Sequence, residues 1–180
     1  KIDQNYWETC GNGTIKITFY ANNSKGNIAF SEVIVQRDTR VPNITIISPS
    51  PFSTFGSNTF SFEIDVDEPI LDTTWYSLTG GTNHTFIGST GTINQAAWGV
   101  CGNGTVIIRF YANNSLGNTA FTDVIVYKDL ISPNIVIISP SSFELFGNST
   151  FDYEIFIDDP ELNLMWYSLN GMNYSFTGLT

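Results

Sequence analysis

Hydrophobic and polar residues alternate along several short segments of the chain. In residues 59–67 (TFSFEIDVD), every second residue is Phe, Ile or Val, and the residues between them are Ser, Glu or Asp. Side chains of a strand point alternately to its two faces, so this segment has one apolar and one polar face. The pattern predicts a half-buried antiparallel strand.

The same alternation recurs elsewhere and extends the prediction to a whole domain. Residues 105–112 (TVIIRFYA) place Val106, Ile108 and Phe110 on one face and Arg109 and Tyr111 on the other. Further strands are predicted at 43–48, 73–78, 84–88 and 121–126, and one helical turn within 94–101. Six or seven short strands separated by Gly, Pro and Asn, without long helical periodicity, predict an all-β fold, an antiparallel β-sandwich.

Much of the pattern occurs twice. Residues 10–38 and 101–129 are identical at 20 of 29 positions, and the matching residues lie 91 positions apart. Outside these segments, Trp7 matches Trp98, and Trp75 matches Trp166 at the same spacing. A repeat of this length predicts tandem β-sandwich domains of about 90 residues each.

The repeat also predicts the domain boundaries. Residues 37–43 (RDTRVPN) and 128–134 (KDLISPN) are linkers of equal length, each containing a stiffening proline. We expect residues 40–129 to form one complete module, residues 1–39 the C-terminal part of a module, and residues 130–180 the N-terminal part of another.

Lys1 aligns with Thr92 and Thr180 with Thr90, so the two partial modules are complementary. Each of them alone has open strand edges and an uncovered apolar face. Two alternatives complete them: the continuing chain of a longer covalent array, or strand complementation between residues 130–180 of one subunit and residues 1–39 of the next. Both predict that the partners are copies of the same module, arranged head to tail.

Three motifs resemble a known family. "WYSLTGG" (75–81), "W..CGNGT....FYANNS.GN" (98–118) and a closing "V.V.KD...P" (124–133) are similar to the tandem immunoglobulin-like (Ig-like) repeats of archaeal and bacterial cell-surface and secreted proteins. The resemblance covers the whole chain and implies Ig-like sandwiches used as stalks, adhesins or filament bodies. The chain departs from the family at the cysteine before Gly-Asn-Gly and at Asn23 and Asn114, where the family has Asp.

Charge and composition exclude several classes of partner. Only 13% of residues are charged and the net charge is −10, which repels phosphate backbones and anionic lipid. We therefore expect no nucleic-acid partner. No run of 18 apolar residues occurs, so no membrane insertion is predicted for this segment.

Eight Asn-x-Ser/Thr acceptors predict N-linked glycans and an extracellular or cell-surface location. They are Asn12, Asn22, Asn43, Asn83, Asn103, Asn113, Asn148 and Asn173. The alternative is that a β protein rich in Asn and Thr contains such triplets by chance. The turn positions Asn22 and Asn113 are the sites where we expect glycans first.

No pattern of catalytic residues is found, so an enzyme is not expected. The single histidine, His84, has no counterpart in the second copy, where Tyr174 takes its place. Two acidic loops are candidate Ca²⁺ sites through Asp67, Glu68, Asp158 and Asp159. We favour solvated loops over calcium, because the spacing lacks the D-x-D-x-D-G order; no other cofactor is expected.

The cysteines and the two outward apolar residues are candidates for contacts between chains. Cys10 and Cys101 provide one cysteine per repeat, so they predict either small buried residues beside the Gly-Asn-Gly turn or an inter-chain disulfide. Ile107 and Phe156 stand on predicted outer faces where the other copy has Lys16 and Asp65.

The repeated tryptophans are expected in the cores, with a sugar-binding platform as the alternative. The function predicted from the sequence is a non-enzymatic structural subunit of an extracellular filament or cell-surface stalk. The alternative is an adhesin or ligand-binding module for a glycan or protein partner.

Overall fold

The chain forms two units in a computed structural model that describes residues 1–177. The units are Lys1–Asp129 and Leu130–Thr180. Thr180, which the sequence aligns with Thr90, lies outside the described residues. Three parts are described below: the N-terminal segment (residues 1–39), the central sandwich (residues 40–129) and the C-terminal segment (residues 130–180).

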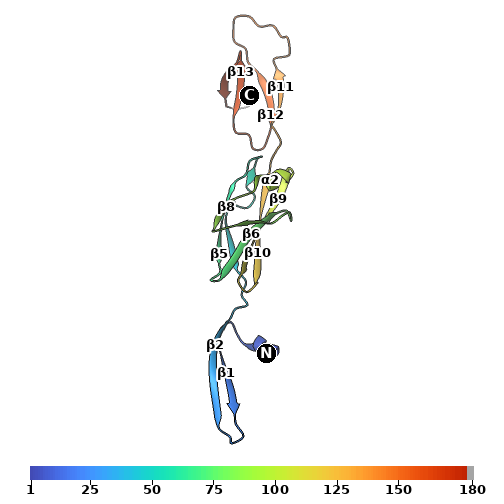
Figure 1. Ribbon diagram of the computed structural model, residues 1–180. Coiled ribbons are helices and arrows are strands. Elements are labelled where there is room, and N and C mark those ends of the chain that lie inside the picture. Colours follow the sequence, from blue (N-terminus) through green and yellow to red (C-terminus); the bar gives the residue numbers. More distant parts are fainter. Residues whose placement is uncertain (178–180) are drawn as a thin grey trace. The chain divides into compact units, whose positions relative to one another are not determined.

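The central sandwich has two sheets that face each other (Figure 1). One sheet has the order β3-β5-β8 and the other the order β4-β10-β9-β6-β7, and all strand pairs are antiparallel except β4 with β10. Its elements are β3 (Asn43–Ser48), β4 (Thr54–Phe55), β5 (Ser61–Asp67), β6 (Leu71–Leu78), β7 (His84–Phe86), β8 (Thr90–Thr92), α2 (Gln95–Val100), β9 (Gly104–Asn114) and β10 (Thr119–Lys128).

The core lies between these two sheets. Phe62 and Ile64 of β5 face Ile108 and Phe110 of β9, and all four are buried. Trp98 of α2 is also fully buried, and its ring meets Phe60 edge-on at 5.1 Å between centroids. The predicted all-β fold is confirmed, and so is the alternation in 59–67 and 105–112 that puts these residues inside.

The short helix α2 is fixed at its start by the side chain of Asn94, which accepts a hydrogen bond from the Ala97 amide (2.9 Å). This capping satisfies an amide that the helix itself leaves without a partner. It explains the helical turn predicted within 94–101, and Asp3 caps α1 (Gln4–Thr9) of the N-terminal segment in the same way.

The N-terminal segment repeats the end of the central sandwich. After α1, β1 (Gly13–Asn22) and β2 (Ile28–Arg37) form an antiparallel ribbon (Figure 1). Gly13 pairs with Arg37 as Gly104 pairs with Lys128, so the register of β1 and β2 is that of β9 and β10.

The C-terminal segment repeats the beginning of the central sandwich. It contains β11 (Asn134–Ser139), β12 (Glu154–Asp158), β13 (Met165–Leu169) and β14 (Met172–Phe176), paired as β11-β12 and β13-β14. The register shift between Ile137 and Ser139 matches the one between Ile46 and Ser48 in the central sandwich.

Of the four tryptophans expected in the cores, Trp98 alone is buried, whereas Trp7 and Trp75 are half-buried and Trp166 is 57% exposed. Trp75 of β6 is out of phase with the buried Thr74, Tyr76 and Leu78, so it lies on the outer face of the five-stranded sheet. There it stacks on Tyr111 at 5.1 Å between ring centroids, with 8° between the planes. The prediction of a core position was wrong for Trp75 and right for Trp98.

Candidate functional site

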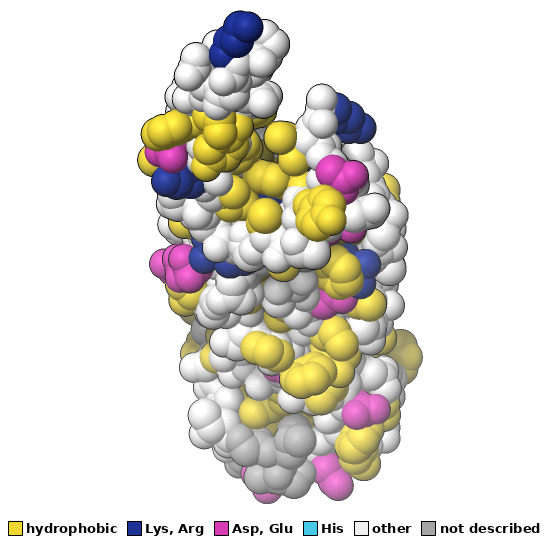
Figure 2. All heavy atoms as spheres, turned by 90° about the horizontal axis from the view of Figure 1, so that it is seen from below, with side chains coloured by type: hydrophobic (Ala, Val, Ile, Leu, Met, Phe, Trp, Pro, Cys, Tyr) yellow, Lys and Arg dark blue, Asp and Glu magenta, His cyan; other side chains and the backbone are white. Residues whose placement is uncertain are grey.

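The repeat allows the same position to be compared in different surroundings. Phe110 is fully buried in the central sandwich, whereas its counterpart Phe19 in β1 is 56% exposed. Leu78 is 6% exposed, whereas its counterpart Leu169 in β13 is 58% exposed. Hydrophobic side chains lie uncovered over much of the face drawn in Figure 2. Exposed apolar areas of this kind mark interaction surfaces in soluble proteins.

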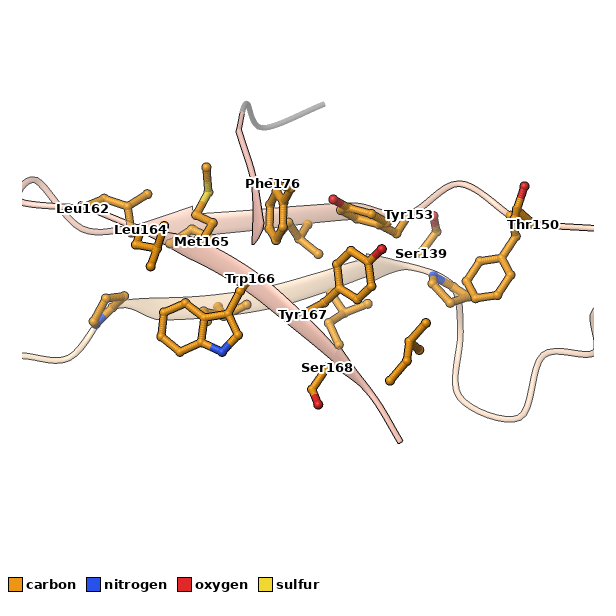
Figure 3. Close-up of a pocket in the computed structure, with 18 residues that line it drawn as sticks. Ser139, Thr150, Tyr153, Leu162, Leu164, Met165, Trp166, Tyr167, Ser168 and Phe176 are labelled. Atoms are coloured by element: carbon orange, nitrogen blue, oxygen red, sulfur yellow. The ribbon is translucent and has the colours of Figure 1, made fainter. Parts of the chain in front are cut away.

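The C-terminal segment contains a cavity of about 780 Å³ between its two strand pairs. Tyr153, Tyr167 and Phe176 come together in it, with Tyr153 at 5.9 Å from Tyr167 and 5.4 Å from Phe176 between ring centroids (Figure 3). Ile135 and Ile157 add aliphatic lining from β11 and β12. The two strand pairs thus form the walls of a sandwich around an apolar space.

A buried lysine ties the end of β10 to α2 in the central sandwich. The ammonium of Lys128 donates to the carbonyl oxygens of Trp98 (2.6 Å) and Cys101 (2.7 Å), and it lies 5.0 Å from the centroid of the Trp98 ring. The residue is only 3% exposed. Carbonyl groups at a helix C-terminus carry partial negative charge, which favours a cation at this place.

Arg37 takes the place of Lys128 in the N-terminal segment. Its guanidinium donates to the Cys10 carbonyl oxygen and lies 5.9 Å from the Trp7 ring centroid. Its Nε is buried and has no hydrogen-bond partner within residues 1–177. Neither basic residue was predicted from the sequence, although each stands directly before the repeated Asp that closes the module.

The linker before the central sandwich is held by two asparagines of the turn between β9 and β10. Asn114 is buried, and its amide donates to the Arg40 carbonyl oxygen (3.4 Å), while that of Asn118 donates to the Asp38 carbonyl oxygen (3.3 Å). Within the linker, the hydrogen bond from Arg40 holds the pKa of the Asp38 carboxyl below its usual value. No residue pattern predicted these linker contacts.

The glycosylation candidates are placed differently in the two copies. Seven of the eight acceptor asparagines are exposed: Asn12, Asn22, Asn43, Asn83, Asn103, Asn148 and Asn173. Asn113 is half-buried, because its side chain accepts from the Thr73 amide (3.0 Å) and donates to Asp72 (3.3 Å). A glycan on Asn113 would have to replace the hydrogen bond to Asp72.

The four candidate calcium ligands lie at the ends of β5 and β12. Glu68 accepts hydrogen bonds from the Ile70 amide (3.2 Å) and the Asn114 side chain (3.4 Å), and Asp159 accepts one from the Glu161 amide (2.7 Å). Asp67 and Asp158 end their strands on the outer, exposed side. In the part of the chain that the structure describes, no three His, Cys, Asp or Glu side chains are grouped closely enough to hold a metal ion.

Both cysteines are free thiols and half-buried. The Cys101 thiol donates to the Ala97 carbonyl oxygen (3.4 Å), and burial raises its pKa although the charge of Lys128 opposes the shift. The Cys10 thiol makes the equivalent contact with the Tyr6 carbonyl oxygen (3.5 Å). The other candidate contact residues, Ile107 and Phe156, are both exposed on the outer faces of their strands.

Aromatic side chains form a row across the outer face of the five-stranded sheet. Trp75 stacks on Tyr111, and Tyr111 lies 6.0 Å from Phe121 between ring centroids. Arg109 covers Phe121 at 4.1 Å and forms two hydrogen bonds with Asp123 (2.7 and 2.8 Å), which lower the pKa of the Asp123 carboxyl. His84, the single histidine, is on the opposite side of this sheet from the row and stacks on Tyr76.

Comparisons with known proteins give only distant likenesses. The chain is similar to fibronectin(III)-like modules of CbhA from Clostridium thermocellum, with a TM-score of 0.42 and 15% identity over 76% of this chain and 80% of that one. It is also similar to an engineered protein, with a TM-score of 0.39 and 18% identity over 52% of this chain. The match spans 21% of the engineered protein. No family model and no curated protein matches the sequence.

Among residues 1–177, no helix has the length and hydrophobicity needed to cross a bilayer.

Proposed function

We propose that this chain is a non-enzymatic structural subunit of an extracellular filament or cell-surface stalk, built from Ig-like modules joined head to tail. The observation that carries the proposal is the contrast between matching positions: apolar side chains that are buried in the central sandwich are exposed in the N-terminal and C-terminal segments. Burying such side chains is a main source of folding free energy. Both segments therefore favour a state in which further modules complete them.

The linker contacts support a mechanical role. The side chains of Asn114 and Asn118 hold the backbone of residues 38 and 40 against the central sandwich, and Pro42 restricts the chain just before β3. A short linker held in this way limits bending between successive modules, which is what a stalk or filament requires.

The extracellular location rests on the acceptor asparagines. Seven of them are exposed, and glycans at such sites would shield the outer faces without disturbing the core. A surface with few charged residues and many Asn, Ser and Thr side chains suits a glycosylated protein.

The proposal is tested by immunogold electron microscopy on the cells that produce the protein, with an antibody raised against the whole chain. We expect gold particles in rows along filaments or stalks on the cell surface. Labelling confined to the cell interior would contradict the proposal.

A second candidate function, glycan binding by an adhesin, is favoured by the row of Trp75, Tyr111 and Phe121. Flat aromatic side chains on an open sheet face provide apolar area with defined geometry for a partner. Titration with oligosaccharides, followed by tryptophan fluorescence, tests this. Tyr111→Ala, which leaves the Trp75 fluorophore in place, should abolish a saturable change that Ile107→Ala, on the same sheet face, leaves intact.

A further inference from the structure

The N-terminal and C-terminal segments each have a strand edge that is paired in the central sandwich. There, β9 is hydrogen-bonded to β10 along one edge and to β6 along the other. Within the described residues, β1 pairs only with β2 and β13 only with β14. β1 matches β9, and β13 matches β6. In the central sandwich, β9 and β6 pair with each other, so the open edges of β1 and β13 are the two edges that are joined there.

The N-terminal segment carries the side chains that the cavity of the C-terminal segment lacks. In the central sandwich, the corresponding space is filled by buried residues of α2 and β9. These residues and their counterparts in the N-terminal segment are Trp98 and Trp7, Val106 and Ile15, Ile108 and Ile17, and Phe110 and Phe19. The counterparts are identical or differ by one methylene, so they fit the same space.

We propose that the N-terminal segment of one copy of this chain completes the C-terminal segment of a second copy, with β1 adding antiparallel to the open edge of β13. The joint rests on the proposed function and identifies its partner. Its register follows that of β6 with β9. Tyr20 then lies opposite Trp166, and Ile17 lies opposite Leu169.

A hydrogen bond from a buried tryptophan fixes how deeply the partner segment is inserted. In the central sandwich, Trp98 Nε1 donates to the Gly56 carbonyl oxygen (2.9 Å), which joins α2 to the loop after β4. In the joint, Trp7 makes this hydrogen bond to the carbonyl oxygen of Gly147. A buried indole N–H needs such a partner, so the bond favours one position over neighbouring ones.

A tyrosine provides a second polar contact on the other wall. The Tyr76 hydroxyl accepts a hydrogen bond from the Asn94 amide (2.7 Å), and burial raises the pKa of this phenol. In the joint, Tyr167 accepts the same bond from the amide of Asp3. Its hydroxyl points into the space that the partner fills (Figure 3).

Chain direction favours a second copy over closure within one chain. The linker meets the central sandwich beside Asn114 and Asn118, at the start of β10, and the chain leaves after Lys128, at the end of β10. A strand of 10 residues is roughly 30 Å long, so the chain enters and leaves the central sandwich at opposite ends of β10. Joining between copies continues this direction.

Disulfide trapping in the full chain tests the register. In a background of Cys10→Ser and Cys101→Ser, the variants Thr18→Cys and Ser168→Cys are combined, because the joint places these two residues opposite each other. Directly opposed residues are about 4.5–5.5 Å apart at Cα, within the range of about 4.4–6.8 Å that a disulfide spans. Mild oxidation should give a ladder of multiples of 20.0 kDa on a non-reducing denaturing gel, and reduction should return it to single chains.

The matched control moves one cysteine by two positions. Lys16 lies on the same face of β1 as Thr18, but Lys16→Cys and Ser168→Cys form a diagonal pair about 7–8 Å apart, outside disulfide range. It should give little of the ladder. Equal cross-linking of both pairs, or of neither, would overturn the register.

A pair of phenylalanines in the same ribbon tests the packing. Phe19→Ala removes a side chain whose counterpart Phe110 is fully buried, whereas Phe30→Ala removes one whose counterpart Phe121 stays 56% exposed in the central sandwich. Sedimentation of the full chain should show association weakened about a hundredfold or more by Phe19→Ala. Phe30→Ala should have little effect.

The results separate the joint from the proposed function. A full chain that stays monomeric at high concentration, with its apolar segments ordered, would overturn the joint. Native filaments that remain one very large species after boiling in denaturant would also overturn it, since their modules would be joined covalently, yet the structural role would stand. Assembly in solution without surface labelling on cells would support the joint and contradict the proposed function.

Discussion

Lys128→Met should destabilise the central sandwich strongly, although it replaces a charged residue by an apolar one of similar length. The wild-type ammonium satisfies two carbonyl oxygens at the end of α2, at 2.6 and 2.7 Å, in a place that water does not reach. Methionine fills the volume of the lysine stem but donates no hydrogen bond. The two carbonyl groups then remain buried without their partner.

The size of the effect follows from these two bonds. Leaving a buried polar group unsatisfied costs about 1–3 kcal/mol, and removing the buried ammonium recovers part of its own desolvation cost. We therefore expect a loss of about 2–4 kcal/mol in the free energy of unfolding of the central sandwich. This corresponds to a fall of roughly 30-fold to 1,000-fold in the folded-to-unfolded ratio.

Native-state hydrogen exchange on the full chain measures this loss at the amides of Ile108 and Val124, which lie in the core strands β9 and β10. Lys128→Arg is the control, because Arg37 in the N-terminal segment makes one of the two equivalent hydrogen bonds and lies against the equivalent ring. The Arg variant should keep most of the protection. If Lys128→Met keeps protection within about threefold of wild type, the two hydrogen bonds do not stabilise the sandwich as argued.

Four further outcomes are expected. The hydrogen bonds from Arg109 lower the pKa of Asp123, so the pair stabilises the fold above the unfolded-state pKa of about 4, and this contribution is lost as pH falls through the lower folded-state pKa. Asp123→Asn should therefore lower the free energy of unfolding by about 0.2–1 kcal/mol at neutral pH, a small value because the pair is exposed. Denaturation measured at a series of acid pH values should show this difference disappearing. Because burial raises the pKa of Cys101, its alkylation rate should rise with pH around a midpoint above that of an ordinary thiol, as followed by peptide mass spectrometry. Glycopeptide analysis of native material should find higher occupancy at the exposed Asn22 than at the half-buried Asn113. Chelation of divalent cations should leave the melting temperature unchanged, because we favour solvated acidic loops; a large shift would indicate bound calcium.

The strands that the sequence predicted best are those whose pattern is local. β5 and β9 alternate apolar and polar residues over their full length, so one face had to be buried whatever the topology. β4 and β8 were not predicted, because segments of two and three residues have no period of their own and exist through pairing with β10 and β5.

Residue type predicted the wrong place for Trp75, where the phase of the strand decides which side is buried. Trp75 was expected in the core because tryptophan is large and apolar, yet it alternates with Thr74 and Tyr76, and Tyr76 faces inward. Only the pairing of Tyr76 with Phe110 shows which of the two phases is buried. Lys128 was missed for the converse reason, since a lysine at the end of a strand is usually in solvent.

The apolar residues that the two copies share on their inner faces are what a joint between modules requires. Ile17 and Ile108, like Phe19 and Phe110, face inward and are identical, because each must fill the same space whether its partner is in the same chain or in another. Lys16 faces outward, where it bonds Glu32 at 2.9 Å, and the second copy has Ile107 there. The outer positions are mixed, since Lys16 differs from Ile107 whereas Tyr20 and Tyr111 are identical. If the segments had no partner, their inner positions would gain nothing by staying apolar. A complementary partner accounts for the exposed apolar residues and for their identity at once.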